Sequence, residues 1–306
     1  MVSTLSIICM VITLLLSLVL PIVIFVWYGL KQKKKEVWIA GVFGAGGFAL
    51  MQLGIRLPIV NTISAIPAFL SWAENNYIWY CFVLAFTAGL FEVVARYGGA
   101  KILYHSKSLT KELTFESGVM AGVGHGGIEA VALIGATYIN NLLFSVMINS
   151  GIWDKLMATI QEAAVQTGDS TIYEAYASVG PLLTDTPWYM YLAAGYERVL
   201  TMAAHTAMTL IVFYFVAQKK DAKGVVIALI IHTLLDFFVV LISGLSTEYL
   251  GNVISQNVSY ALMYVMLTVV AVASVVVVFK IKGIWKITES IPAGIEPENM
   301  EMANVG

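Results

Sequence analysis

The sequence places ionisable side chains inside long apolar stretches, where a lone charge is costly. Moving such a group into a membrane costs roughly 2.5–3.5 kcal/mol, so each one is a functional candidate. The candidates are Glu92, Arg96, His125, Glu129, Glu197, Arg198, His205, His232 and Asp236. They include three of the four histidines in the chain; the fourth, His105, falls in a basic segment.

The spacing of these residues pairs imidazoles with carboxylates. His125 and Glu129 are four residues apart, as are His232 and Asp236, so each pair shares one face of a helix. At about 1.5 Å per residue, His125 lies ~15 Å, His205 ~18 Å and His232 ~12 Å from the cytoplasmic end of its predicted span. Glu129 and Asp236 fall near ~21 and ~18 Å on the same scale. Because the hydrocarbon core is about 30 Å thick, five groups from three helices should converge near its midplane.

Three histidines beside carboxylates are the ligand types that zinc takes from proteins. A tetrahedral site with one open position holds a water molecule whose pKa falls to about 7, and a nearby glutamate can accept its proton. We therefore predict His125, His205 and His232 as ligands of Zn²⁺. Asp236 is predicted as a fourth ligand or as the partner that fixes an imidazole tautomer. Glu129 is predicted as the general base.

The remaining charged residues form two close pairs with supporting roles. Glu92 and Arg96 stand four residues apart near the predicted inner end of their span. An ion pair at that depth can extend its charged ends toward the interface, so a structural role is favoured. Glu197 and Arg198 lie deeper and could neutralise each other, orient His205 or contact a substrate.

Glycines crowd the segment around His125. They are Gly118, Gly122, Gly124, Gly126 and Gly127. Small residues let helices approach closely in lipid. Packing is the favoured role for the first two, whereas the pair directly after His125 could equally loosen the helix.

The composition predicts an all-α, polytopic membrane bundle of about seven helices. The chain is 59% hydrophobic and only 12% charged, with a mean hydropathy of +0.84 over 306 residues, against about 25% charged residues in a soluble domain. Seven runs approach the ~20 apolar residues that cross a bilayer. They lie at about 4–30, 37–53, 77–95, 115–138, 188–217, 224–244 and 259–279. The chain is therefore expected in the cell membrane as a multi-pass protein.

The basic residues predict the orientation of these spans. Fourteen of the 17 Lys and Arg residues fall on one side, whereas Arg56 and Lys155 fall on the other and Arg198 lies inside a span. Positive residues mark the cytoplasmic side, so the N-terminus is predicted outside and the C-terminus inside. This orientation requires an odd number of spans.

The other segments complete one predicted transmembrane domain, 1–288. Residues 58–76 are expected to form a re-entrant or surface segment, and 151–187 an outer loop with a helix lying on the membrane surface. Residues 289–306 are predicted to be a disordered, acidic cytoplasmic tail. The net charge of −2 suggests no nucleic-acid partner. The two cysteines are interpreted as packing residues.

Several of these motifs resemble the YhfC family of membrane peptidases. The resemblance rests on Gly122-Val-Gly-His125-Gly-Gly-Ile-Glu129-Ala, on Glu197-Arg198 with His205, and on His232-Thr-Leu-Leu-Asp236. It extends from about Val37 to Phe279 and includes Phe91-Glu92 and Arg96. The glycine-flanked His125 motif is its specific part.

The resemblance implies a site of known pattern. The family is grouped with the CAAX-protease and PrsW-like intramembrane peptidases, which carry a glutamate motif, a histidine on the next core helix, and a histidine followed four residues later by Asp or Asn. Glu129, His205, His232 and Asp236 match this pattern in order. The usual Glu-Glu pair with a following Arg is absent around Glu129, and His125 stands one turn earlier instead.

The leading hypothesis is therefore an intramembrane metallopeptidase. It would hydrolyse peptide bonds of a membrane-associated protein or peptide, by metal-dependent or glutamate-and-water chemistry, with access from the cytoplasmic side or laterally from lipid. A proton-coupled small-molecule transporter is the first alternative, because midplane His, Asp and Glu groups also suit proton relays. The second is a non-catalytic membrane partner or immunity protein of the same superfamily, in which the polar cluster only holds helices together.

Overall fold

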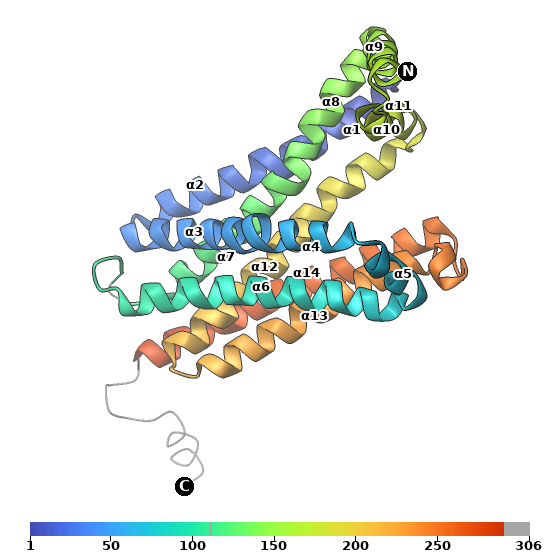
Figure 1. Ribbon diagram of the computed structural model, residues 1–306. Coiled ribbons are helices and arrows are strands. Elements are labelled where there is room, and N and C mark those ends of the chain that lie inside the picture. Colours follow the sequence, from blue (N-terminus) through green and yellow to red (C-terminus); the bar gives the residue numbers. More distant parts are fainter. Residues whose placement is uncertain (111, 291–306) are drawn as a thin grey trace. The chain divides into compact units, whose positions relative to one another are not determined.

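The computed structural model describes residues 1–110 and 112–290 of the chain. Over these residues it is all-helical and contains no strand (Figure 1). Seven helices are long and apolar enough to cross a membrane. The predicted all-α membrane protein with seven spans is thereby confirmed.

Figure 1 labels the helical elements from which the spans are built. The first span consists of α1 (Thr4–Leu14), η1 (Leu15–Val19) and α2 (Leu20–Gln32). The second span consists of α3 (Lys35–Phe48), η2 (Ala49–Arg56) and α4 (Leu57–Ser64). The third span is α6 (Tyr77–His105). The fourth span consists of α7 (Phe115–Glu129), η3 (Ala130–Gly135) and α8 (Ala136–Asn149). The last three are α12 (Trp188–Ala217), α13 (Asp221–Gly244) and α14 (Gln256–Ser290). The connecting helices are α5 (Pro67–Asn75), α9 (Ile152–Thr167), α10 (Thr171–Ala177), α11 (Val179–Asp185) and η4 (Glu248–Leu250).

Several spans extend further than the sequence predicted, and in two of them the extension changes where charged residues lie. The second was expected to end at Leu53 but reaches Ser64. The helix continues through Pro58, which lies in the first turn of α4 directly after the π-helical stretch η2. The third was expected to end at Ala95 but continues to His105. The charged residues near both predicted ends therefore lie within their spans.

Three spans contain a widened, π-helical stretch, at η1, η2 and η3. Each stretch joins two α-helical parts of its span without a break. Such stretches are rare and occur frequently at functional sites. In η2 the stretch includes Gln52 and Arg56, which are both buried.

Within the predicted domain 1–288, the backbone groups into two compact units. Unit 1 comprises Met1–Ile24 and Glu129–Val199, and unit 2 comprises Phe25–Ile128 and Leu200–Gly306. In unit 1, α1 packs against α8, and the carbonyl oxygen of Tyr191 accepts hydrogen bonds from Thr13 (2.6 Å) and Tyr138 (3.0 Å).

Unit 2 is organised around α6. This helix packs along α13 and also contacts α3 and η2, and α13 in turn contacts α14 (Figure 1). Its buried apolar core includes Val93 and Leu103 of α6 together with Met208, Leu210 and Phe213 of α12. The helices of unit 2 thus share one apolar interior, in which any polar group must find a partner.

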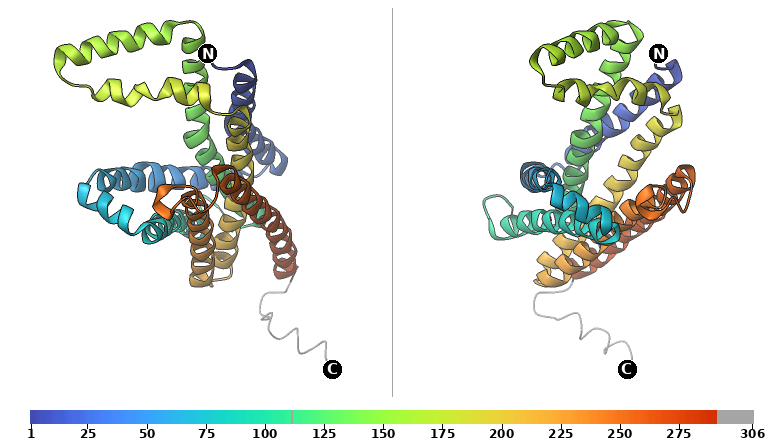
Figure 2. Two further views of the ribbon diagram at one scale, coloured as in Figure 1. Left: turned by 90° about the vertical axis from the view of Figure 1, so that its right-hand side faces the viewer. Right: turned by 45° about the vertical axis from the view of Figure 1, so that its right-hand side comes forward.

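The segment 151–187 was predicted to contain one surface helix, and the structure gives three helices. α9 carries the predicted helical spacing, and Figure 2 shows α10 and α11 returning beside it in unit 1. Its position on a membrane surface remains a prediction. The predicted acidic tail, 289–306, lies outside the described residues from 291 onward.

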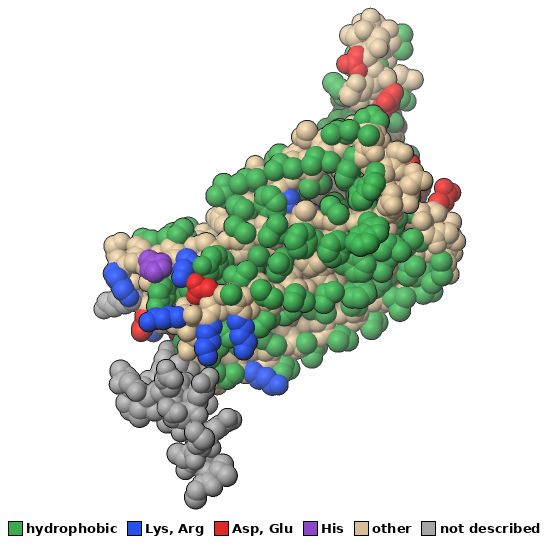
Figure 3. Space-filling model, turned by 60° about the horizontal axis from the view of Figure 1, so that its bottom comes forward, with side chains coloured by type: hydrophobic (Ala, Val, Ile, Leu, Met, Phe, Trp, Pro, Cys, Tyr) green, Lys and Arg blue, Asp and Glu red, His purple; other side chains and the backbone are tan. Residues whose placement is uncertain are grey.

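Basic side chains gather at one end of the face of unit 2 shown in Figure 3, next to a broad hydrophobic area. Near the end of α6, Lys101 forms an ion pair with Asp221, the first residue of α13, at 2.6 Å between Nζ and Oδ2. The orientation of the spans across the membrane remains a prediction.

Candidate active site

Five polar side chains meet in the apolar interior of unit 2. Glu92 and Arg96 come from α6, His125 from α7, His205 from α12 and His232 from α13; each is at most 5% exposed. We call these five residues the central cluster. The ring centroids of His125 and His205 are 5.3 Å apart, and those of His205 and His232 are 5.4 Å apart. The structure therefore brings together the three imidazoles that the sequence predicted to meet.

The carboxylate of Glu92 lies at the centre of the cluster. Its Oε2 is 2.9 Å from Nε2 of His125 and 3.5 Å from the Nδ1 atoms of both His205 and His232. Its other oxygen, Oε1, accepts a hydrogen bond of 2.7 Å from Nε2 of Gln52. One carboxylate thus contacts all three imidazoles.

The guanidinium of Arg96 lies beside that carboxylate and also faces the histidines. Its Nη2 is 2.9 Å from Oε2 of Glu92, 3.2 Å from Nε2 of His125 and 2.7 Å from Nδ1 of His205. Its Nη1 is 3.3 Å from Nδ1 of His232. Arg96 is therefore held within the cluster by groups from four helices.

The expectation that Glu92 and Arg96 extend toward the interface is wrong, because both side chains are buried. The predicted span ended at Ala95, which placed the pair near a helix end, whereas α6 continues to His105. Glu92 lies thirteen residues before that end, or about 20 Å at 1.5 Å per residue. This depth matches the one calculated for the histidines. The spacing of four residues between Glu92 and Arg96 was the sequence signal that could have identified them.

Asp236 contacts the cluster from its edge. Its Oδ2 lies 3.2 Å from Nε2 of His232, and its side chain is 35% exposed. The opposite ring atom of His232, Nδ1, faces Glu92 and Arg96. Of the two roles predicted for Asp236, this geometry favours the partner that fixes the tautomer of His232.

Glu129 and Arg198 form an ion pair within unit 1. Arg198 donates from Nη1 to Oε1 of Glu129 at 2.9 Å, and its Nη2 donates to Glu197. The side chains of Glu129 and Arg198 are 12% and 9% exposed. The structure shows an ion pair between Glu197 and Arg198, with Glu129 as a further partner of Arg198.

Sequence reasoning missed three polar residues of unit 2 that contact the cluster or its first partners. Gln52 donates to Glu92, and Thr209 Oγ1 accepts from Nε of Arg96 at 3.2 Å. Arg56 donates from Nη1 to Oε1 of Gln52 at 3.4 Å and from Nη2 to the carbonyl oxygen of Leu84 at 2.8 Å. Arg56 was placed in an outer segment because the second span was predicted too short.

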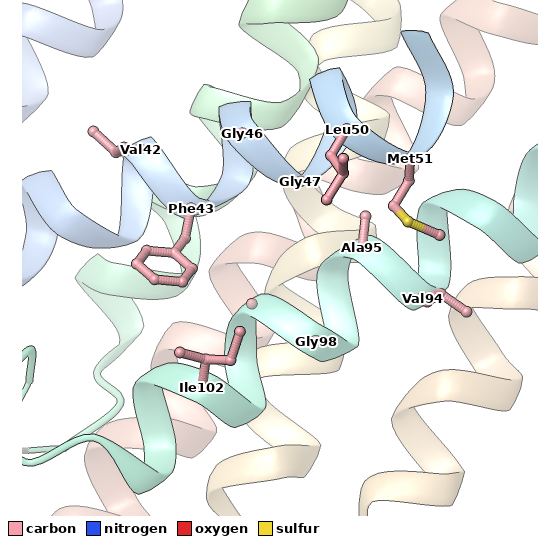
Figure 4. A pocket seen from close by; sticks show the side chains of 11 residues that line it. Val42, Phe43, Gly46, Gly47, Leu50, Met51, Val94, Ala95, Gly98 and Ile102 are labelled. Carbon is pink, nitrogen blue, oxygen red and sulfur yellow. The ribbon is translucent and has the colours of Figure 1, made fainter. Parts of the chain in front are cut away.

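An apolar groove lies between α6 on one side and α3 with η2 on the other (Figure 4). Its volume is about 460 Å³, and its floor includes two glycine pairs, at 46–47 and 98–99. A small cavity of about 10 Å³ is lined by Arg96 and His125. The groove and this cavity share Phe43, Ala95 and Gly99 as lining residues. The groove therefore reaches the wall of the central cluster.

Seven apolar spans and a buried cluster of Glu, Arg and His define an integral membrane protein with a polar centre inside its spans. A family model described as YhfC intramembrane metalloprotease matches residues 16–258, and the chain belongs to this family. The chain is 25% identical over 222 residues to the uncharacterized membrane protein YhfC of Bacillus subtilis (strain 168), covering 72% of this chain and 79% of that protein. No solved structure matches the chain. The predicted family and the multi-pass membrane location are thereby confirmed.

A metalloprotease family implies a metal, and the cluster offers donors that fit one. Single ligand atoms of Glu92, His205 and His232 all lie within 4.8 Å of one another, and all three residues are buried. Carboxylate oxygens and imidazole nitrogens are ligands that zinc accepts. This set differs from the predicted ligands, which included His125 and Asp236 in place of Glu92.

Proposed function

We propose that the chain is an intramembrane metallopeptidase that hydrolyses peptide bonds of a membrane-associated protein or peptide. The observation that carries this proposal is the Glu92 carboxylate, buried inside unit 2 among three imidazoles from three other helices. Even when it is paired, a buried set of charged and polar groups is often no more stable than apolar packing of the same volume, so its presence in an apolar interior favours a chemical role over packing.

Glu92, His205 and His232 would hold the metal, and we propose zinc. When bound at such donors, zinc polarises a carbonyl group and activates water for attack. His125 lies 2.9 Å from Glu92 and would keep that carboxylate oriented. Asp236 would accept a hydrogen bond from Nε2 of His232 and so fix the orientation of that ring, as carboxylates that contact metal-binding histidines commonly do.

Glu129 is proposed as the residue that accepts a proton during hydrolysis. It follows His125 by one helical turn and is the last residue of α7. The hydrogen bond from Arg198 fixes one of its carboxylate oxygens. A base whose orientation is fixed in this way is ready for proton transfer, which typically contributes 10²- to 10⁴-fold to a rate (about 3–5 kcal/mol).

Glu129→Gln is expected to lower peptide hydrolysis by about 10²- to 10⁴-fold while leaving the bound metal unchanged. The amide keeps the shape of the side chain but cannot accept the proton. The measurement compares metal per protein by elemental analysis with the appearance of new peptide termini in membranes. Glu116→Gln, in the first turn of the same helix, is the matched control.

The same comparison tests the function as a whole. Membranes of a deletion strain carrying the wild-type chain should contain protein termini that are missing when it carries the Glu129→Gln variant. Elemental analysis should find zinc in the wild type and a loss of it in His205→Ala. Identical termini in both strains, together with a purified protein that binds no divalent metal, would remove the proposal.

The apolar groove supports lateral access of the substrate from lipid. Its walls are hydrophobic, with Val42 and Leu50 each 62% exposed, and its floor approaches the cluster at Ala95 and Gly99. An apolar segment lying in the groove would place its neighbouring peptide bond next to the cluster. Gly46 and Gly98 leave room there, because a Cβ added at either one meets no atom within 4 Å.

The double change Gly46→Leu and Gly98→Leu is expected to fill the groove and lower cleavage by about tenfold, the effect of losing roughly 1.4 kcal/mol of binding. Folding and metal content should stay at the wild-type level, because both positions are open and leucine favours helix. Gly283→Leu, on α14, is the control, since its Cβ also meets nothing within 4 Å. Undiminished cleavage by the double variant would exclude this route of access.

A further inference from the structure

The guanidinium of Arg96 contacts the same three residues that would bind the metal. Its Nη2 lies 2.7 Å from Nδ1 of His205 and 2.9 Å from Oε2 of Glu92. Its Nη1 lies 3.3 Å from Nδ1 of His232. These three atoms belong to the residues whose ligand atoms lie within 4.8 Å of one another. The cluster therefore already contains one cation of its own.

Arginine and a metal ion require the same electrons from these atoms. A guanidinium carries five donors and no acceptor, so each imidazole nitrogen that it bonds must offer a lone pair. A metal ion binds an imidazole through that lone pair as well. For His232, the contact of Nε2 with Asp236 is consistent with a free lone pair on Nδ1. One lone pair cannot serve Arg96 and a metal ion at the same time.

The position of Arg96 is built into the fold. Besides the metal-binding groups, its Nε donates to Thr209 of α12 at 3.2 Å, and its side chain is fully buried. Arg56 shows that a buried arginine in a neighbouring span can be satisfied differently. Its donors face Gln52, Thr87 and the carbonyl oxygen of Leu84.

We propose that Arg96 is a resident cation that satisfies the metal-binding groups in the metal-free protein and must withdraw from them when the metal binds. The proposal rests on the metal site of the proposed function. Without a cation, the buried carboxylate of Glu92 would lose its ion pair and the lone pairs of two imidazoles would lose their donor, which is unfavourable in an apolar interior. Arg96 removes that cost, and its positive charge opposes a divalent ion at the same donors. Metal binding is thus an exchange of one cation for another.

The first experiment titrates zinc into metal-stripped, full-length protein in nanodiscs. Arg96→Gln removes the charge but keeps an amide donor, and it is expected to bind zinc at least about tenfold more tightly than the wild type. Arg96→Lys keeps a cation and should stay closer to the wild type than to Arg96→Gln. Arg56→Gln is the matched control, because it removes a buried guanidinium whose donors face Gln52, Thr87 and the carbonyl oxygen of Leu84, and its gain should be much smaller.

Thermal unfolding gives a second signature in the same samples. Arg96→Gln should unfold at a lower temperature than the wild type without zinc, since the cluster loses its cation. Saturating zinc should then raise its Tm by more than it raises that of the wild type. Equal zinc affinity in the wild type and Arg96→Gln, or an equal gain in Arg56→Gln, would overturn the proposal.

A measurement on the wild type avoids any failure of a variant to fold. The chain has only three arginines, at 56, 96 and 198, so arginine labelled with ¹⁵N in the guanidinium gives few signals. Arg96→Lys assigns the signals of Arg96. Zinc should shift these signals while those of Arg56 stay in place, and zinc binding without such a shift would contradict the proposal. If neither the wild type nor Arg96→Gln binds zinc, the proposed metal site itself fails; normal binding without any effect of Arg96 removes only this inference.

Discussion

Glu92→Gln is expected to remove zinc binding and peptide hydrolysis together. The change replaces the one carboxylate that contacts all three imidazoles by a neutral amide of the same shape. Mutating a group that only hydrogen-bonds a metal ligand typically weakens metal binding by about 10- to 100-fold. Because Glu92 is proposed as a direct ligand, its loss should weaken zinc binding by more than about 100-fold. Elemental analysis and a zinc titration of the purified protein measure this loss.

The same variant should also be less stable without metal. Arg96 loses the buried charge with which it pairs at 2.9 Å, and removing one partner of a buried pair typically costs about 3–5 kcal/mol. Glu36→Gln, in the first turn of α3, controls for the loss of a carboxylate elsewhere in unit 2. If Glu92→Gln holds zinc as well as the wild type, the ligands are the three histidines predicted from the sequence, and Glu92 has another role. Comparison with Glu129→Gln, which should keep its metal, separates a ligand from a base.

Gly124→Val is expected to destabilise the fold by about 3 kcal/mol or more, as overpacking against backbone does. A Cβ at Gly124 would lie 2.1 Å from the carbonyl oxygen of Gly41 on α3. Neither backbone can move away cheaply, because α7 is also close to α12, where a Cβ at Gly122 would lie 2.5 Å from Cα of Thr206. The variant should therefore force α7 away from its neighbours and carry His125 out of contact with His205.

The stability of this variant is measured by thermal unfolding, and the cluster by zinc binding. Gly98→Val is the control within a span of the same unit, since a Cβ there meets nothing within 4 Å. Gly98→Val should unfold near the wild-type temperature, whereas Gly124→Val should unfold well below it. A wild-type Tm for Gly124→Val would show that α3 and α7 are not held in close backbone contact.

The glycines around His125 illustrate how far sequence reasoning reached. Packing was favoured for Gly118 and Gly122, and both are close to α12 in the structure. For the pair after His125 the choice was open, and Gly126 also proves tightly packed, with its Cβ position 3.1 Å from Cβ of His205. The number and spacing of these glycines indicate that they lie between helices, but they do not identify which helix each glycine faces.

The common level of the three histidines could be predicted because it depends on depth alone. Residue counts along a helix give depth to within about one turn, and that was sufficient. The place of Glu92 could not be obtained in this way, because an early span end at Ala95 moved it toward the interface. Hydropathy falls at Arg96, and hydropathy cannot distinguish a charge that ends a helix from one that is paired inside it.

The widened stretch in the second span limits what any helical wheel can say about this family. A π turn takes in one residue more than an α turn, which offsets the following residues by about 100°. In η2 this offset determines the direction of Gln52 and Arg56, whose contacts are with Glu92 and with Thr87 and Leu84 of α6. Relatives that lack the extra residue should show a one-residue gap near this point, and ungapped alignments would pair side chains pointing in different directions.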